Sequence, residues 1–186
     1  MVSACSSTGT GGDGPTSELD LRADGIGPYL VGQPADEVIA GISAEIGGAD
    51  GDSSDSDTPL LVPDCGSPGT RVVSWGNLVL FFVDRSEASV FATWSYGFDP
   101  ITGNAQDIRG LGLTTDVGIG LGSTRGDLTD AYGSTVVFSP DIDLELETFS
   151  INAQADEHLA GRLTSLDPDA TVQFLERQPA CVEIAG

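Results

Sequence analysis

Two segments with helix-start patterns, each followed by a long β-rich stretch, constrain the fold of this chain more than any other feature. Residues 32–38 read GQPADEV and residues 122–128 read GSTRGDL, so a glycine, a first-turn residue, acidic side chains and an aliphatic residue recur in order. We expect helices over residues 34–46 and 124–132. Each should end at the glycine that follows it, because glycine adopts the conformation that terminates helices.

The residues at these helix starts fit their expected positions. Pro34 suits a first helical turn, where its missing N–H has no intrahelical partner. Ser123 or Thr124 can cap the second helix, and the helix dipole favours Asp127 in its first turn. In the first helix the aliphatic residues recur at helical spacing and predict one buried stripe. They are Val38, Ile39, Ile42 and Ile46.

The segments after both helices are rich in Val, Phe, Trp and Thr, which favour strands. After the first helix we expect strands over 71–75, 77–84 and 88–96. After the second we expect strands over 134–139, 142–151, 157–164 and 170–177. Strands that follow a helix, twice, predict an α+β fold of two tandem helix-plus-antiparallel-sheet repeats packed into one compact unit. Residues 19–110 would form the first repeat and residues 111–186 the second.

The N-terminal residues point to lipid attachment. Residues 2–5 read VSAC and resemble a lipobox, which implies cleavage before Cys5 and diacylglycerol on its sulfur. Residues 6–17 are rich in Gly, Ser and Thr and should form a disordered tether, with a reach on the order of 20 Å. No apolar leader precedes Cys5, so we expect that it has been removed. The alternative is a stray cysteine in a flexible terminus within residues 1–18.

Cys65 and Cys181 remain as a pair. In an exported chain such a pair normally forms a disulfide. A bridge would close a loop of more than 100 residues. It would stabilise the fold by roughly 4–5 kcal/mol. The alternative is two buried thiols in a cytoplasmic protein.

The charge of the chain limits its partners. It has 29 acidic and 7 basic residues, a net charge of -22, and no lysine. Nucleic-acid binding needs clustered basic side chains, so we exclude it. A basic partner, divalent cations or a salt-rich medium fits this charge, although acidity that only keeps the protein soluble also explains it.

The sequence contains no constellation that predicts catalysis. His158 is the only histidine, and a lone histidine at a strand start is more often a surface residue than a general base. No nucleophile elbow, Cys/His metal spacing or cofactor motif occurs. The glycines of residues 118–124 could hold an anion at a helix start, but a tight turn explains them better. The four carboxylates of residues 50–57 could bind a cation, or form a solvated connector.

One acidic segment is a candidate binding surface. Residues 141–147 read DIDLELE, a strict alternation that would place the acids on one strand face. The acids are Asp141, Asp143, Glu145 and Glu147. Such a stripe is typical of a half-buried strand with a protected edge, and it could also dock a basic partner.

Aromatic residues form a second candidate surface. Trp94 and Tyr96 share one face of an expected strand, and Trp75 ends another. Exposed on an open sheet, they would supply a binding hot spot. The alternative is that they pack beneath the helices.

These features resemble two groups of proteins. The GIGLGST segment at 118–124, the paired β segments and the late cysteine resemble uncharacterised actinobacterial secreted lipoproteins. The tandem helix-plus-sheet pattern resembles the β-lactamase-inhibitory-protein-like fold and small outer-membrane assembly lipoproteins. The resemblance to the β-lactamase-inhibitory-protein-like fold implies a concave sheet that binds a partner protein with aromatic and charged side chains. The chain departs from it, with one helix per repeat and one long-range cysteine pair.

We therefore expect a lipid-anchored extracytoplasmic binding module that engages a protein or envelope component and does no catalysis. It would meet the membrane only through the lipid on Cys5, because no stretch of about 18 apolar residues occurs. The alternative is an envelope sensor that binds a small ligand or a divalent cation through residues 50–57 or 118–124.

Overall fold

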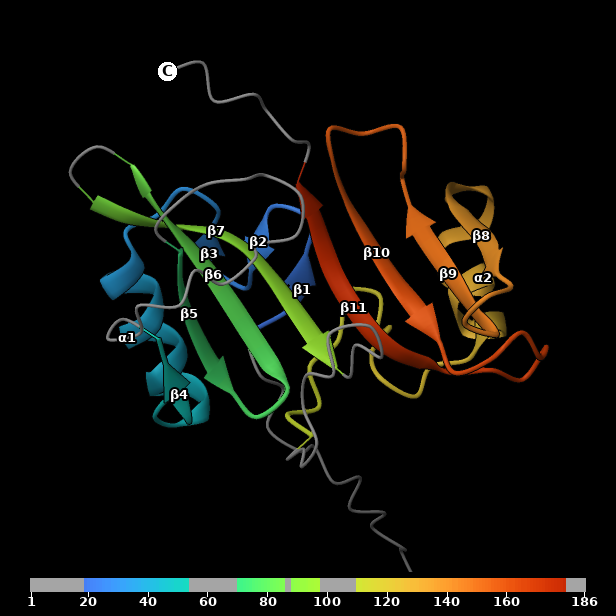
Figure 1. Ribbon diagram of the computed structural model, residues 1–186, viewed down its shortest axis with the longest axis horizontal. Coiled ribbons are helices and arrows are strands. Elements are labelled where there is room, and N and C mark those ends of the chain that lie inside the picture. The colour runs from blue at the N-terminus through green and yellow to red at the C-terminus, as the bar shows by residue number, and fades with distance from the viewer. Residues whose placement is uncertain (1–18, 54–69, 86–87, 98–109, 180–186) are drawn as a thin grey trace, which may run out of the picture.

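The chain forms one large antiparallel sheet covered on one face by two helices and a small three-stranded sheet. A computed structural model describes residues 19–53, 70–85, 88–97 and 110–179. The large sheet has eight strands in the order β4-β5-β6-β7-β11-β10-β9-β8. In Figure 1 this sheet faces the viewer, and α1, the small sheet and α2 lie behind it.

The elements follow one another along the chain with short connections in most places. The small sheet comprises β1 (Leu21–Arg22), β2 (Gly25–Ile26) and β3 (Tyr29–Leu30). The first half of the large sheet comprises β4 (Gly51–Asp52), β5 (Thr70–Trp75), β6 (Leu78–Arg85) and β7 (Ala88–Gly97). The second half comprises β8 (Val136–Asp141), β9 (Leu146–Ile151), β10 (Glu157–Leu163) and β11 (Val172–Pro179). A 3₁₀ turn, Gly133–Thr135, leads into β8.

The first helix, α1 (Ala35–Ile46), lies where the sequence predicts it. Pro34 is its N-cap, and Gly47 ends it with a φ of 98°, a value that favours glycine. Val38 and Ile42 are fully buried, while Ile39 and Ile46 pack against the same core from half-buried positions. The apolar stripe is therefore confirmed.

The second helix, α2 (Arg125–Tyr132), also lies at its predicted position. Thr124 caps it: the Asp127 amide donates to Thr124 Oγ1 at 3.1 Å, and the Thr124 amide donates to the Asp127 carboxylate at 2.7 Å. This capping box satisfies two backbone donors at the helix start. Leu128 is the one fully buried residue of α2, so this helix contributes little to the core.

The predicted fold class is wrong. The described residues are 48% strand and 18% helix, and both groups of longer strands belong to the same eight-stranded sheet, so the fold is not a balanced α+β arrangement of two helix-plus-sheet repeats. The two groups of strands join where β7 pairs with β11, through Leu175 opposite Tyr96. Periodicity identified most of the longer strands and missed the two-residue strands β1 to β4. Pairing between distant strands depends on tertiary packing that local patterns do not report.

The core lies between the sheet and its covering layer, and its largest side chains come from the central strands. Cross-strand partners on the covered face include Leu80 opposite Trp94 and Leu78 opposite Tyr96. A register shift between Phe81 and Phe82 brings Phe82 opposite Phe91, and their rings lie 5.8 Å apart. Such paired aromatics bury a large apolar area and stabilise the centre of the sheet.

One buried arginine fastens the small sheet to the large one. Arg177 of β11 is 4% exposed. Its guanidinium donates to the carbonyl oxygens of Ala23 at 2.7 Å and Ala92 at 2.9 Å, and it pairs with Glu157. A buried charge is stable only when it is paired and hydrogen-bonded, and this one is both.

No helix within the described ranges is long and apolar enough to cross a membrane.

Candidate binding surface

The predicted aromatic surface does not exist, because all three aromatic residues are core residues. Trp75 is 0% exposed, and Trp94 and Tyr96 are 1% exposed. The alternative reading, in which they pack beneath covering elements, is what the structure shows. The sequence pattern placed Trp94 and Tyr96 correctly on one strand face, but periodicity alone does not reveal that the face is covered.

The polar atom of each aromatic side chain contacts a different covering segment. Trp75 Nε1 donates to Ser43 Oγ of α1 at 3.3 Å, and Trp94 Nε1 donates to the Arg22 carbonyl of β1 at 3.1 Å. The Leu113 amide donates to the Tyr96 hydroxyl at 3.3 Å. Buried Trp and Tyr need such partners, and here the bonds hold the covering layer on the sheet.

The acidic segment is not one continuous strand. β8 ends at Asp141, β9 begins at Leu146, and a turn over residues 142–145 connects them. The Leu144 amide donates to Asp141 Oδ1 at 3.2 Å, and Glu145 has a φ of 53°, in the left-handed region. An alternating sequence can thus also form a hairpin tip, in which an aspartate side chain stabilises the turn.

The four acids consequently occupy different environments. Asp143 and Glu145 are exposed at the hairpin tip, and Asp141 is half-buried beside them. Glu147 is 6% exposed, so it does not belong to this surface. We call the three remaining acids the hairpin acids: Asp141, Asp143 and Glu145.

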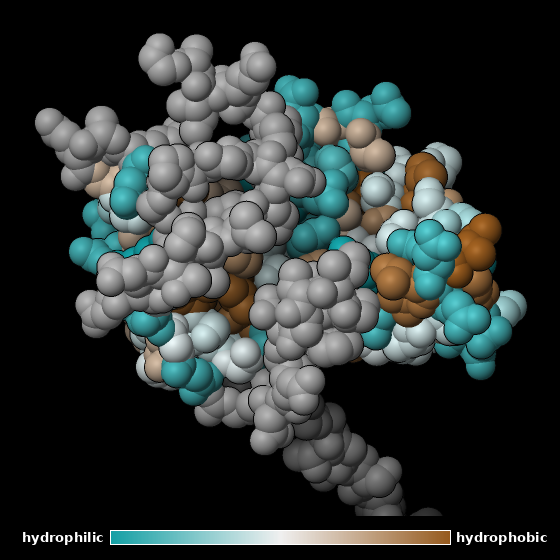
Figure 2. Space-filling model, in the orientation of Figure 1, coloured by the Kyte–Doolittle hydropathy of each residue, from teal (hydrophilic) through white to brown (hydrophobic). Residues whose placement is uncertain are grey.

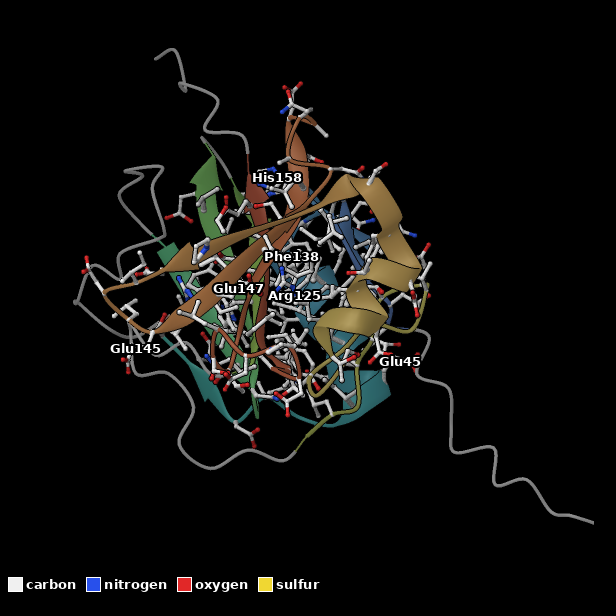
Figure 3. All side chains as sticks on the ribbon, turned by 90° about the vertical axis from the view of Figure 1, so that its right-hand side faces the viewer. Glu45, Arg125, Phe138, Glu145, Glu147 and His158 are labelled. Carbon is white, nitrogen blue, oxygen red and sulfur yellow. The ribbon has the colours of Figure 1, made fainter. Side chains whose placement is uncertain are left out.

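Glu147 instead joins the hairpin to α2. Its Oε2 lies 3.4 Å from Nε of Arg125, and the Arg125 guanidinium lies 4.6 Å from the centre of the Phe138 ring. Figure 3 shows these three side chains together between α2 and the β8–β9 hairpin. The cluster joins the helix to the end of the sheet through this ion pair and the cation–π contact.

Large apolar side chains are exposed on the same part of the molecule as the hairpin acids. Ile142 is 78%, Val137 54% and Leu144 45% exposed. Figure 2 shows apolar side chains at the end that carries β8 and β9, next to hydrophilic ones. Exposed apolar residues that gather beside polar ones are typical of interaction surfaces.

β8 is also an edge strand of the large sheet, and some of its backbone groups have no partner in the part of the chain that the structure describes. The Asn152 amide donates to the Thr135 carbonyl at 2.9 Å, and residues of an antiparallel pair alternate between bonding the neighbour and facing away. The register pairs Val136 with Ile151 and Pro140 with Glu147. Val136, Phe138 and Pro140 therefore direct their backbone groups to the open edge. Pro140 suits such a position because it has no N–H.

Every arginine whose side chain the structure describes is already engaged. Arg22 pairs with Asp24, Arg125 with Glu147 and Arg177 with Glu157. Arg71 contacts Asp36 and Asp52, and Arg162 lies 5.0 Å from the centre of the Phe174 ring. Among the described side chains, the hairpin acids therefore have no basic partner and form a negative surface.

A pocket of about 300 Å³ opens at the start of β8. Its walls come from β1, the turn at residues 115–118, the end of α2 and the β9–β10 connection. Aliphatic side chains form its floor: Leu21, Ala23, Ile151 and Leu159. Polar residues line its rim: Arg22, Asp116, Tyr132, Asn152, Glu157 and His158.

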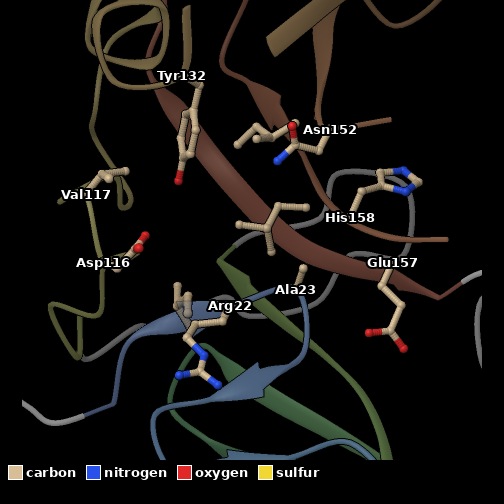
Figure 4. A pocket seen from close by; sticks show the side chains of 11 residues that line it. Arg22, Ala23, Asp116, Val117, Tyr132, Asn152, Glu157 and His158 are labelled. Atoms are coloured by element: carbon tan, nitrogen blue, oxygen red, sulfur yellow. The ribbon is translucent and has the colours of Figure 1, made fainter. Parts of the chain in front are cut away.

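The polar rim residues do not all face the pocket. Figure 4 shows the phenol of Tyr132 and the carboxylate of Asp116 on the pocket side, and the ring of His158 pointing away. Burial raises the pKa of Tyr132, so the phenol is protonated at neutral pH. It donates to Thr115 Oγ1 at 2.9 Å.

His158 lies on β10 and is half-buried. Its Nδ1 is buried and has no hydrogen-bond partner among the described residues. Within the described residues, no hydrogen bond or ion pair joins the His158 ring to a nucleophile or to a second acid–base group.

The glycine turn at residues 118–124 is not an anion cradle. Its backbone donors are used within the fold, and those of Gly118, Ile119, Gly120, Gly122, Ser123 and Thr124 all have protein acceptors. An anion would have to displace these bonds. The tight-turn reading is therefore the one that the structure supports.

The acidic connector at residues 50–57 is described only in part. Asp50 accepts a hydrogen bond from the Gly76 amide at 2.6 Å, and Asp52 pairs with Arg71 at 2.8 Å. Residues 54–57 lie outside the described ranges. Within those ranges no group of three or more potential ligands is placed to hold a metal ion.

The cysteines Cys5, Cys65 and Cys181 all lie outside the described residues. Sequence reasoning missed Asp116, Tyr132 and Asn152, three of the polar residues that line the pocket. No spacing signal links them, because they come from a loop, a helix end and a strand end that only the fold brings together. The apolar–acidic alternation of residues 141–147 was the one local signal for the open edge.

No family model, no curated protein and no solved structure matches this chain.

Proposed function

We propose that this chain is a lipid-anchored extracytoplasmic binding module whose β8 edge holds a basic, extended segment of a partner protein, without catalysis. The observation that carries the proposal is the β8 edge itself. There, exposed apolar side chains, free backbone groups and the hairpin acids lie together. The lipobox-like sequence VSAC at residues 2–5 and the Gly/Ser/Thr-rich sequence of residues 6–17 support the location.

Each part of this edge would contribute differently to the affinity or the rate of binding. Free N–H and C=O groups of Val136 and Phe138 can pair with an added strand, which gives affinity from main-chain hydrogen bonds. The apolar side chains of Val137, Ile142 and Leu144 would lose water on binding. The hairpin acids would select positive charge and speed association.

The charge distribution favours a foreign partner over a second copy of the chain. Two copies would each carry a net charge of -22, and like charges across an interface are costly. A segment rich in Lys or Arg would meet no exposed, uncompensated arginine among the described side chains, because each is already engaged.

A synthetic peptide tests this proposal. An eight-residue peptide that alternates Lys and Thr should bind the 186-residue chain, and a matched Glu–Thr peptide should not. On binding, hydrogen exchange of the Val136 and Phe138 amides should slow. The variant Asp141→Asn/Asp143→Asn/Glu145→Gln should weaken binding by about tenfold, as expected for several exposed charge contacts.

A matched variant controls for net charge. Glu37→Gln/Glu45→Gln/Asp84→Asn removes the same number of charges from exposed positions on α1 and β6. It should leave peptide affinity nearly unchanged. Equal weakening in both variants, or no protection of the β8 amides, would contradict the proposal and indicate unspecific attraction to an acidic protein.

A further inference from the structure

We propose that the pocket beside β8 binds an aliphatic cation, a primary ammonium or guanidinium at the end of an apolar stem. This inference rests on the proposed function, because such a group is the end of a lysine or arginine side chain. The pocket adjoins the proposed edge: Ile151, which lines it, pairs with Val136, the first residue of β8.

The ionic groups around the pocket leave a single uncompensated charge. Arg22 donates to Asp24 at 2.9 and 3.0 Å, and Glu157 is held by Arg177. Asp116 is exposed at the rim, and no described residue hydrogen-bonds or pairs with it. A pocket with one unpaired carboxylate favours a cation and disfavours an anion.

Tyr132 provides a second acceptor. Its hydroxyl hydrogen is committed to Thr115 Oγ1 at 2.9 Å, and that oxygen also accepts from the Ile119 amide at 3.2 Å. The phenol oxygen can therefore act toward the pocket only as an acceptor. An ammonium carries donors and no acceptor, so it matches a site made of a carboxylate and a phenol oxygen.

The floor of the pocket determines the rest of the ligand. Leu21, Ile151 and Leu159 present methyl groups rather than hydrogen-bonding atoms. A ligand that reaches Asp116 and Tyr132 while covering this floor needs a short aliphatic stem. The volume of about 300 Å³ is at the lower end of small-molecule pockets, which suits one side chain or a simple amine.

Titration of the 186-residue chain with n-butylammonium, followed by amide NMR shifts, tests this site. Shifts should be largest at Val117, Asn152 and Leu159. Neutral n-butanol and anionic butyrate, which share the stem, should bind at least fivefold more weakly. The variant Asp116→Asn should weaken amine binding by about fivefold, and Tyr132→Phe by about threefold.

Asp130→Asn is the matched control, because Asp130 is exposed on α2 and does not line the pocket. It should change amine affinity by less than a factor of two. Equal weakening by Asp116→Asn and Asp130→Asn, or equal binding of butanol and butylammonium, would overturn the inference.

The alternating Lys–Thr peptide separates two sources of the cation. If a partner side chain fills the pocket, Asp116→Asn should weaken the peptide and the amine alike. If a free amine is the ligand, Asp116→Asn should weaken the amine alone. Peptide binding that depends on the hairpin acids, without any amine binding, would overturn this inference and leave the proposed function intact.

Discussion

The two edges of the large sheet are built in opposite ways. At one edge β4 has two residues, Gly51–Asp52. At the other edge β8 has six residues, Val136–Asp141. A long, exposed edge strand can pair with other chains, and proteins usually shorten or cover such edges. The β4 edge follows this rule, and the β8 edge departs from it.

The difference extends to how the charges are used. Near β4, Arg71 contacts Asp36 at 3.1 Å and Asp52 at 2.8 Å, and these two carboxylates raise the pKa of Arg71. Near β8 the only described arginine, Arg125, pairs with the buried Glu147. No described basic side chain pairs with the hairpin acids. The comparison shows that the carboxylates near β4 form ion pairs that stabilise the fold, whereas the hairpin acids face solvent.

The largest expected effect concerns the sheet that separates the edges. Strand polarity places Thr70, which starts β5, and Pro179, which ends β11, at the same end of the sheet. Cys65 precedes Thr70 by five residues and Cys181 follows Pro179 by two. A disulfide between them should raise the free energy of unfolding of the whole sheet, and with it both edges, by roughly 4–5 kcal/mol.

In a Cys5→Ser background, urea unfolding followed by circular dichroism should show that loss for Cys65→Ser, for Cys181→Ser and for the double variant alike. Reductant should destabilise the parent and leave the variants unchanged. Two freely reactive thiols in the unreduced, folded protein would refute the bridge.

Trp94→Ala comes next, because it removes a core side chain midway between the edges. We expect a loss of about 3–5 kcal/mol, as for other large-to-small changes at buried aromatic positions. Trp94→Phe should cost less, since it keeps a ring opposite Leu80. Thermal melting monitored by circular dichroism measures both, and an unchanged melting temperature for Trp94→Ala would contradict the buried position.

The arginines at the two edges give a direct comparison. Arg125→Ala leaves buried Glu147 without its partner and should cost about 2–3 kcal/mol. Arg71→Ala leaves only partly exposed acids and should cost about 1 kcal/mol or less. Urea unfolding of both variants checks the order. A larger loss at Arg71 would show that the β4 network is the stronger of the two.

The smallest effect is a pH dependence at the start of α2. Hydrogen bonds from the backbone N–H and the hydroxyl of Thr124 hold the pKa of Asp127 below its ordinary value of 3.8. Because the folded pKa is depressed, the contribution is present above that value and is lost as the pH falls through the folded pKa. Asp127→Asn should therefore be slightly less stable than the parent at pH 6, with the difference vanishing near pH 2.

Urea midpoints measured across this range test the cap. Asp130→Asn, at an exposed site outside the capping box, is the control and should show no such convergence.

The sequence predicted the helices well because their signals are local. Thr124 and Asp127 form the capping box within four residues, and Gly47 ends α1 through its own backbone conformation. The longer strands β5, β6, β7, β10 and β11 were also predicted closely, since β-branched and aromatic runs between turns mark them without any partner. The two-residue strands β1 to β4 were not predicted, and the strand expected over 142–151 begins only at Leu146. Such signals depend on a few neighbouring residues, so they can be recognised in the sequence without knowledge of the fold.

The parts that failed depend on distant residues. Leu175 opposite Tyr96 joins the two groups of strands into one sheet, and nothing near either residue indicates that pairing. The sequence pattern around Trp75, Trp94 and Tyr96 is the same for an exposed and for a covered sheet face. Only the fold places α1, β1 and the Leu113 segment over them. The pocket had no sequence signal at all.

The hydrogen bonds between the covering layer and the two tryptophans also make intrinsic fluorescence a probe of how that layer separates from the sheet. Trp75 and Trp94 are the only tryptophans in the chain, and each indole contacts a different covering element. With selective excitation of tryptophan, a Trp94→Phe protein would emit only from the indole beneath α1, and a Trp75→Phe protein only from the indole beneath β1. Emission maxima recorded during unfolding would then show whether the helix and the N-terminal strands leave the sheet together or one after the other.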